Sequence, residues 1–414
     1  MLIVGSGNGN DAAVSLRRGD RHIDAVEIDP RILDIGIDLH PARPYQDPRV
    51  DAIVDDGRAF LRTTNSKYDL IIFAQPDSLT LFSTAGNIRL ESFLFTQEAF
   101  ASVRDHLSPD GVFVMYNFYW QPWLIERLGG MLSTAFGEPP VVSYYNSVDG
   151  HAAVLADGPG LKATGGIPPG GTADRLDLSA APAPATDDWP FLYLREPGIA
   201  PYYLGALGIF LVAAAASVFA AARYTGLAVR RLSPHFFVLG GAFLLLETRS
   251  LVTFGLLFGN TWVVNSLVFF AVLVSVLAAI GVSSRVRLER RWPLYVALFA
   301  STLVAWLLPP DSLLIDPPVL RYLLASVVAF APVFFANLCF TYSFRDTTAA
   351  DMAFASNLLG AVCGGALEYL ALITGYQALL VLVAVLYGAA YLLATRLRVL
   401  ADRDLGNEGQ LEPA

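Results

Sequence analysis

The sequence is poor in cysteine and in basic residues. Its two cysteines, Cys339 and Cys363, both lie in apolar runs, so they form neither a disulfide framework nor a metal site and are expected to pack. Acidic residues outnumber basic ones by 37 to 28, and the net charge of −9 argues against a nucleic-acid-binding protein. The histidines of the first half show no ligand spacing, and surface or capping roles are expected for His22, His40, His106 and His151. We therefore predict no metal and no nucleic-acid partner.

Charge is scarce above all in the second half of the chain. Residues 1–198 carry most of the charged side chains, whereas residues 199–395 contain long runs without any. Hydrophobic residues make up 54% of the sequence and the mean hydropathy is +0.49, which is too apolar for an ordinary soluble enzyme of this size. This distribution predicts a soluble α/β domain followed by a membrane domain.

The first thirty residues show the most informative pattern. An apolar strand over 2–4 runs into three glycines, Gly5, Gly7 and Gly9, and a helical stretch and a second strand ending on Glu27 follow. Glycines let the backbone approach a ligand closely, and the following helix N-terminus offers unpaired N–H groups. An acid at the end of the second strand can accept hydrogen bonds from both ribose hydroxyls. Because the spacing is not G-x-G-x-x-G, a dinucleotide is the weaker interpretation, and we expect a nucleoside. The alternative is a plain strand–helix–strand turn without a ligand.

Further strands alternate with helices up to about residue 136. Strands are predicted over 50–54, 70–73 and 112–116, with helical stretches between them. Such alternation predicts a mostly parallel sheet covered on both faces, and ligands of these sheets bind beyond the carboxyl ends of the strands. Three acids follow strands in this way and are expected on one rim: Glu27, Asp56 and Asp77.

These pieces together resemble the spermidine synthase (polyamine aminopropyltransferase) family, which has the S-adenosylmethionine-dependent methyltransferase fold. The resemblance covers about residues 1–155. The segments that carry it are the glycine loop 5–9, Val26-Glu27-Ile28-Asp29-Pro30, Asp56-Gly57 with Phe60-Leu61, Tyr68-Asp69-Leu70-Ile71-Ile72, Phe95-Thr96-Gln97-Glu98-Ala99-Phe100 and Pro109-Asp110-Gly111-Val112.

The resemblance implies a role for each candidate site residue. Glu27 would hold the ribose of an S-adenosyl donor, and Asp56 would hold the adenine amino group. Asp77 would match the second acid of the D-x-x-D pair that grips the acceptor amine, which makes it the candidate catalytic residue. The donor would be decarboxylated S-adenosylmethionine or S-adenosylmethionine, without a metal. The remaining cofactor-binding candidates are Gly5, Gly7, Gly9 and Gly57.

The chain departs from the family pattern at two positions. Asn8 stands where the family's glycine loop usually carries an acid, and Ala74 stands at the first acid of the D-x-x-D pair. An alkyl ammonium has a pKa of about 10, so a group in the site must take the proton of the acceptor amine. Either Asp77 does this alone, or the site binds a nucleoside without the transfer. The family's upstream β-hairpin also lacks a counterpart, and we expect further sequence upstream in the natural protein or its relatives.

The predicted domain boundaries follow from composition. The α/β domain covers residues 1–156, and residues 157–198 form a Gly/Pro/Ala-rich linker with an interfacial segment. Within it, the acids and aromatic residues of 186–194 predict a stretch at the membrane surface, and the alternative is a last strand or lid packed on the soluble domain. The transmembrane domain covers 199–398, and 399–414 is a polar tail.

About seven transmembrane helices are expected. Each candidate is close to the roughly 20 residues that cross a bilayer. Arginine-rich loops follow the first, third, fifth and seventh spans, which places these loops in the cytoplasm and the soluble domain outside. Because an S-adenosyl donor is cytosolic, we leave the side of the soluble domain open. The spans are 200–222, 236–258, 262–284, 292–310, 320–344, 352–374 and 376–395.

Charged residues inside these spans are costly and therefore informative. Glu247 or Glu368 is expected to pair with Arg249 and hold the bundle together, and the alternative is a path for a polar substrate. Small residues spaced four apart, in the pairs Gly360 with Gly364 and Ala361 with Gly365, predict close helix packing.

The sequence therefore predicts a Rossmann-like, methyltransferase-type α/β domain followed by an all-α multi-pass transmembrane bundle. The expected protein resides in a bacterial inner (plasma) membrane, binds an S-adenosyl-type nucleoside and acts on a small-molecule amine, with an aminopropyl or another alkyl group transferred. The alternative is a transporter or sensor whose nucleoside-binding domain is catalytically degenerate. The lipid bilayer is the expected partner, and the oligomeric state is left open.

Overall fold

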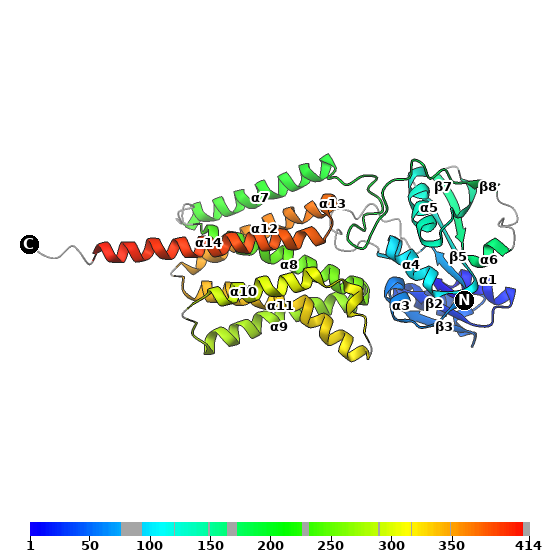
Figure 1. Ribbon diagram of the computed structural model, residues 1–414, viewed down its shortest axis with the longest axis horizontal. Helices are drawn as coiled ribbons and strands as arrows, with labels where there is room; N and C mark the ends of the chain where they lie inside the picture. Colours follow the sequence, from blue (N-terminus) through cyan, green and yellow to red (C-terminus); the bar gives the residue numbers. More distant parts are fainter. Residues whose placement is uncertain are drawn as a thin grey trace, which may run out of the picture. The chain divides into compact units, whose positions relative to one another are not determined.

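A computed structural model describes residues 1–75, 93–119, 121–147, 150–163, 172–225, 232–288, 290–315, 317–347 and 349–408. The chain divides into two compact units. The first comprises Met1–Pro197 together with Gly255–Asn265, and the second comprises Gly198–Phe254 and Ser266–Ala414. In Figure 1 the first unit contains all the labelled strands, and the second unit is helical.

The first unit is built on an eight-stranded sheet of order β3-β2-β1-β4-β5-β7-β6-β8. The first five strands in this order pair in parallel, and β7, β6 and β8 extend the sheet with antiparallel pairing. This topology confirms the predicted methyltransferase-type α/β fold. The strands are β1 (Leu2–Val4), β2 (Ile23–Glu27), β3 (Val50–Val54), β4 (Tyr68–Ala74), β5 (Leu107–Tyr119), β6 (Val141–Ser147), β7 (Gly150–Asp157) and β8 (Thr172–Arg175).

Helices cover both faces of this sheet (Figure 1). Successive side chains of a strand point to opposite faces, and in β1 Leu2 and Val4 belong to one hydrophobic cluster while Ile3 belongs to another. The first cluster also contains Phe73 and Phe113, packed edge to face. The helices are α1 (Asn10–Arg18), α2 (Pro30–Leu39), α3 (Gly57–Thr63), α4 (Gln97–His106), α5 (Pro122–Phe136) and α6 (Pro159–Ala163), with 3₁₀ turns η1 (Pro44–Gln46) and η4 (Phe93–Phe95).

The segment predicted as a linker with an interfacial stretch belongs to the first unit instead. It contributes α6 and β8 to the α/β fold, and Leu192 is buried in the sheet's hydrophobic cluster. The guanidinium of Arg127 is almost fully buried and donates to the carbonyl oxygens of Leu192, Leu194 and Arg195 at 2.6–2.7 Å. Residues 186–194 therefore pack on the α/β unit, which was the alternative to a stretch at the membrane surface. Their acidic and aromatic side chains have their contacts within this unit.

Asp187 fixes the stretch 186–194 to the rest of the first unit. Its Oδ2 lies 2.8 Å from Arg62 and 3.2 Å from Arg58, and Thr96 donates to its Oδ1 at 2.6 Å. Burial of a charge is costly unless it is paired, and this arrangement gives the Asp187 carboxylate two cationic partners. The acid that suggested a membrane surface in the sequence therefore has a structural role inside the first unit.

The second unit contains six helices that are long and apolar enough to cross a membrane, among the residues that the structure describes. They correspond to six of the seven predicted spans. The seventh, predicted over 292–310, is the 16-residue helix α10, which is shorter than the roughly 20 residues of a full span. The helices are α7 (Pro201–Thr225), α8 (Pro234–Phe258), α9 (Trp262–Arg285), α10 (Trp292–Leu307), α11 (Pro318–Arg345), α12 (Ala350–Leu367), α13 (Ala371–Thr374) and α14 (Gln377–Glu408), with 3₁₀ turns η6 (Pro310–Leu313) and η7 (Glu368–Leu370).

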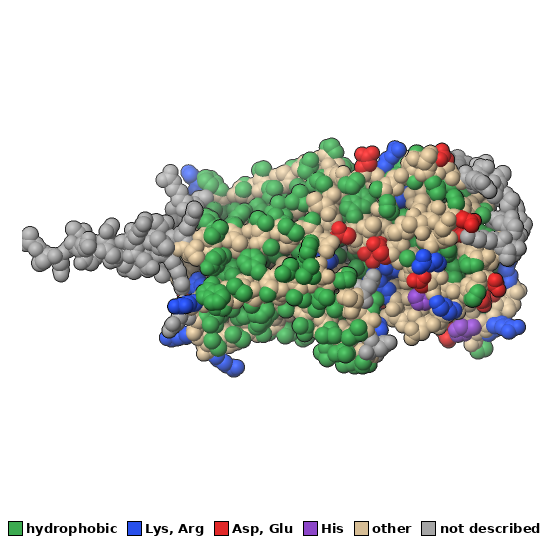
Figure 2. Space-filling view, in the orientation of Figure 1, with side chains coloured by type: hydrophobic (Ala, Val, Ile, Leu, Met, Phe, Trp, Pro, Cys, Tyr) green, Lys and Arg blue, Asp and Glu red, His purple; other side chains and the backbone are tan. Residues whose placement is uncertain are grey.

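The surface of the helical unit is predominantly hydrophobic, whereas acidic side chains are visible mainly over the α/β unit (Figure 2). On α9, Phe270, Leu273 and Leu277 each expose more than 60% of their area. An apolar surface this extensive is unusual for a protein surrounded by water and suits a bilayer. The predicted polar tail, residues 399–414, begins as a continuation of α14, which ends at Glu408.

Glycines allow α8 and α12 to pack backbone against backbone. A methyl group on Gly360 would overlap the Phe237 carbonyl oxygen, and one on Gly364 would press on the backbone of Gly241. On α8, a methyl group on Gly240 would overlap the Asn357 carbonyl oxygen. The predicted pair of small residues Gly360 and Gly364 therefore lies at a close helix crossing, as expected for small residues four apart.

Candidate functional site

The glycine loop lies at the carboxyl end of β1. Gly5, Gly7 and Gly9 all have positive φ angles, of 77°, 56° and 98°, a conformation that strains side chains other than glycine. The N–H groups of Gly5 and Ser6 donate to the Val26 carbonyl oxygen at 2.9 and 3.0 Å, which fixes the loop to the neighbouring strand β2. The three glycines are thus required by the backbone path of this loop.

Glu27 ends β2 beside this loop. Its side chain is buried, with 6% exposed, and its carboxylate accepts hydrogen bonds from the backbone N–H groups of Gly7 at 2.8 Å and Asp29 at 3.0 Å. Each carboxylate oxygen has two lone pairs, so each retains a site for a further donor. The structure therefore brings together the predicted acid and the predicted glycine loop.

Asp56 follows β3 and caps the N-terminus of α3. Its Oδ1 accepts from the N–H groups of Arg58 at 2.8 Å and Ala59 at 3.2 Å, the usual function of an Asp at this position. A methyl group on Gly57 would overlap the side chain of Val4, so the glycine lets the start of α3 approach β1. Parallel pairing places the carboxyl ends of β1, β2 and β3 at one edge, and this edge carries the glycine loop, Glu27 and Asp56.

Asp55, next to the capping residue, has an altered acidity. Its Oδ1 accepts from the Asp56 N–H at 2.8 Å, and its own N–H donates to the Glu27 carbonyl oxygen at 3.1 Å. Burial raises the pKa of Asp55 to about 6. This carboxyl group therefore titrates near neutral pH within the same sheet edge.

Two tyrosines complete the surroundings of the loop, and neither was among the predicted site residues. The Tyr45 hydroxyl lies 2.8 Å from the Gly7 carbonyl oxygen, and burial raises the pKa of Tyr45 to about 12, which keeps it neutral. The Tyr116 hydroxyl donates to Asp11 Oδ2 at 2.7 Å. Its partner lies 105 residues away in the sequence, so only the strand register could have indicated the pair.

Ala74 is the last residue of β4 and is buried, with 6% exposed. It pairs in register with Tyr116 of β5. The next residue, Gln75, has a φ of +47°, which is uncommon for a non-glycine residue and is found at sites where the surrounding structure imposes it. The candidate catalytic residue Asp77 lies outside the described residues.

The amino ends of β2 and β3 carry a different cluster. His22 Nε2 lies 2.9 Å from Asp24 Oδ1 and 3.7 Å from Asp51 Oδ2, and the Tyr68 hydroxyl donates to Asp24 Oδ2 at 2.6 Å. The sequence predicted a surface or capping role for His22, and the structure has it exposed at the surface, within 4 Å of two carboxylates. The cause is parallel strand pairing, which sets Asp24 opposite Asp51.

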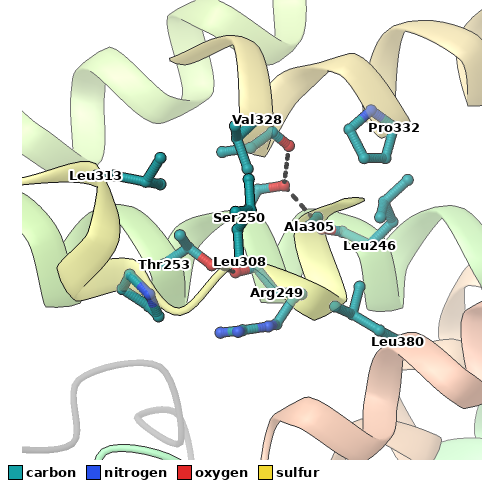
Figure 3. A pocket seen from close by; sticks show the side chains of 12 residues that line it. Leu246, Arg249, Ser250, Thr253, Ala305, Leu308, Leu313, Val328, Pro332 and Leu380 are labelled. Atoms are coloured by element: carbon teal, nitrogen blue, oxygen red, sulfur yellow. Dashed lines mark hydrogen bonds between the residues drawn. The ribbon is translucent and has the colours of Figure 1, made fainter. Parts of the chain in front are cut away.

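Polar groups of the second unit contact one another across helices. Thr248 of α8 donates to Glu368 Oε2 at 3.1 Å, and both side chains are buried. Near them, Arg249, Ser250 and Thr253 line a cavity of about 20 Å³ whose other walls are mainly apolar (Figure 3). This is room for about one water molecule, so the cavity does not admit an amine of polyamine size. Glu368 thus has a hydrogen-bond partner on the neighbouring helix α8, and the predicted pairing of Glu247 or Glu368 with Arg249 stays a prediction.

The sheet order and the residues at its edge define the class of the first unit, a methyltransferase-like fold with acids after β2 and β3. Comparison with known families gives a narrower assignment. Residues 1–134 match the spermine/spermidine synthase domain. The N-terminal region of this chain therefore carries a spermine/spermidine synthase domain, as the motifs predicted.

The chain is also similar in sequence to curated polyamine aminopropyltransferases. The chain is 32% identical over 120 residues to the polyamine aminopropyltransferase of Alkaliphilus metalliredigens, covering 28% of this chain and 39% of the relative. It is 31% identical over 159 residues to that of Pectobacterium carotovorum, covering 36% of this chain and 52% of the relative. The chain thus spans about half the length of these relatives or less. The spermidine synthase of Thermotoga maritima aligns with 19% identity and a TM-score of 0.34, covering 41% of this chain and 56% of that structure.

Proposed function

We propose that the first unit binds an S-adenosyl-type nucleoside at the carboxyl ends of β1, β2 and β3 and transfers an aminopropyl or another alkyl group to an amine. The observation that supports this most strongly is the buried carboxylate of Glu27, held by the N–H groups of Gly7 and Asp29. These contacts fix a charged acceptor beside a glycine loop, which suits the two hydroxyl groups of a ribose.

The other residues of the sheet edge fit the rest of such a ligand. Asp56 Oδ1 is used to cap α3, and we propose Oδ2, which accepts the Asn260 N–H at 3.1 Å in this structure, as the acceptor for an adenine amino group. The backbone of Gly5, Gly7 and Gly9 allows close approach of the ligand. The proposed donors are decarboxylated S-adenosylmethionine and S-adenosylmethionine.

The transfer is a displacement at carbon. The amine lone pair forms the new C–N bond while the C–S bond breaks, and its electron pair passes to the sulfonium sulfur, which leaves as a neutral thioether. Because an alkyl ammonium has a pKa of about 10, the acceptor amine must first lose a proton to a base before this lone pair is available. Ala74 cannot accept it, so we propose Asp77 as the group that accepts the proton and positions the amine.

We further propose that the second unit anchors the protein in the bacterial inner membrane. Six described helices have the length and hydropathy of membrane spans, and α9 exposes large apolar side chains along its length. In this proposal the bilayer is the partner of the helical unit, and the chemistry belongs to the first unit.

A transfer assay tests the proposed reaction. Full-length protein in detergent is given decarboxylated S-adenosylmethionine and a diamine, and methylthioadenosine release is measured. Restoring a carboxylate with Ala74→Asp is expected to raise turnover at least tenfold, since general acid–base groups contribute about 10²–10⁴-fold. Ala74→Asn, which has a similar shape without the charge, is the matched control and should not raise it. Equal turnover of the two variants would contradict the expectation that a second carboxylate, at position 74, assists Asp77 in removing the proton.

The second candidate function is a sensor or transporter with a catalytically degenerate nucleoside domain. The observation that favours it is the burial of Ala74, which supplies no proton acceptor at the end of β4. Under this alternative the protein binds methylthioadenosine, but neither the wild type nor Ala74→Asp releases it from the decarboxylated donor. Methylthioadenosine release by the wild type would reject this alternative.

A further inference from the structure

The first unit includes one segment from far along the chain, Gly255–Asn265, which we call the connector. It contains the last turn of α8, residues 259–261 and the first turn of α9. The connector makes hydrogen bonds at both ends of α3. The Asn260 N–H donates to Asp56 Oδ2 at 3.1 Å, and Arg62 Nη1 donates to the Leu256 carbonyl oxygen at 2.8 Å. The connector therefore contacts both ends of α3, the short helix that begins directly after Asp56.

The contact at Asp56 depends on a glycine. Gly259 has a φ of +87°, and a methyl group there would overlap Asp56 Cβ and press on Ala59 Cβ. The backbone of the connector thus lies directly against the side chain of Asp56. A residue with a side chain at this position would be strained by its φ angle and would also collide with the capping residue.

The two oxygens of Asp56 are used differently. Oδ1 accepts two N–H groups of α3, and Oδ2 accepts the N–H of Asn260. The helix cap is needed whether or not a ligand is present, so Oδ2 is the oxygen that remains for an adenine amino group. Oδ2 keeps a lone pair after it accepts the Asn260 N–H, but the backbone of Gly259 and Asn260 lies directly against the Asp56 side chain. The competition therefore comes from the space that this backbone takes and not from the number of hydrogen bonds.

We propose that the connector is a built-in competitor of the nucleoside: Asn260 and Gly259 occupy Asp56, and nucleoside binding displaces them. This inference rests on the proposed nucleoside site. When only a fraction of the protein is in the state that binds the ligand, the apparent dissociation constant equals the intrinsic one divided by that fraction. A connector that keeps Asp56 covered therefore raises the apparent dissociation constant. Coupling of this kind is reciprocal, so the nucleoside in turn releases the segment that joins α8 to α9.

The binding test uses full-length protein in detergent with methylthioadenosine as the probe. Gly259→Ala should push the connector off Asp56 and lower the dissociation constant about tenfold. Gly19→Ala is the matched control, because Gly19 also has a positive φ, of +94°, but an added methyl group meets nothing within 4 Å. Its dissociation constant should equal that of the wild type.

Hydrogen exchange of the wild type gives a second test that needs no variant. Saturating methylthioadenosine should speed exchange of the Asn260 amide at least tenfold. The Arg58 amide, which donates to Asp56 Oδ1, should stay protected and serves as the internal control.

The outcomes separate this inference from the proposed function. If Glu27→Ala abolishes binding while Gly259→Ala leaves it unchanged or weaker, and Asn260 stays protected, the nucleoside site stands and the competitor is wrong. If neither the wild type nor Gly259→Ala binds methylthioadenosine, the proposed function is overturned and the inference with it.

Discussion

The two units of this protein satisfy their polar groups in different ways. In the first unit, the carboxylates of Glu27 and Asp56 gather at one edge of a sheet and accept hydrogen bonds from backbone N–H groups. In the second unit, polar side chains are spread over the bundle and contact a neighbouring helix, as in Thr248 with Glu368 and Asn337 with Ser275. A cluster of acids held by backbone remains able to receive a ligand, whereas pairs between helices mainly hold the bundle together.

The largest expected effect tests the helical side of this comparison. Gly360→Val places a branched side chain against the Phe237 carbonyl, where backbone cannot move aside. Overpacking of an ordinary core costs about 1–3 kcal/mol, and we expect at least the upper value here. Thermal unfolding in detergent should show a strongly lowered midpoint. Gly281→Val on α9, where an added methyl group meets nothing within 4 Å, is the control. Similar midpoints for both variants would contradict the close crossing.

The next effect concerns Arg127 of the first unit and the carbonyl groups that it contacts. Arg127 holds three carbonyl groups and lies 5.0 Å from the Trp123 ring, and burial lowers the pKa of Arg127 to about 10, so it stays charged at neutral pH. Arg127→Ala leaves these carbonyls without the guanidinium, and a loss of about 3 kcal/mol in unfolding free energy is expected. Tryptophan fluorescence during denaturation measures it. Arg49→Ala removes an ion pair at the surface and should cost much less than Arg127→Ala; equal losses would contradict the structural role of Arg127.

The smallest effect is a pH dependence at the sheet edge. Burial raises the pKa of Asp55 to about 6 from an ordinary value of about 3.9. The folded protein therefore binds this proton more tightly than the unfolded chain, and stability falls as pH rises from about 4 to about 6. Asp55→Asn keeps an oxygen for the Asp56 N–H and removes the charge. The variant should lose this part of the pH dependence in thermal unfolding between pH 4 and 7.5. Profiles that run parallel to the wild type would contradict the raised pKa.

The fold and part of the site could be predicted because they depend on local patterns. The glycine loop before α1, Glu27 after β2 and Asp56 before α3 all follow from short runs of sequence. The contact of Tyr116 with Asp11 could not be predicted, because it depends on the register of β5 beside β4. The docking of residues 186–194 was predicted only as an alternative for a related reason, since the arginine partners of Asp187 lie about 125 residues away in the sequence.

The helical unit shows the same limit. Hydropathy predicts where apolar helices lie. The four-residue spacing of Gly360 and Gly364 predicted a close helix crossing. Hydropathy could not fix the length of α10, which ends at Leu307 and is followed by the Pro310–Leu313 turn. It also could not pair Glu368 with Thr248, because that contact joins residues 120 positions apart.

The most direct test of the account is the affinity of the full-length protein for methylthioadenosine with and without the Glu27 carboxylate. Two hydrogen bonds from ribose hydroxyls to a charged acceptor correspond to about 3 kcal/mol, or about 100-fold in dissociation constant. Glu27→Gln should weaken binding by about this factor, whereas Asp34→Asn, at an exposed carboxylate on α2, should leave it unchanged. A Glu27→Gln variant that binds as tightly as the wild type would contradict a nucleoside site at this edge of the sheet.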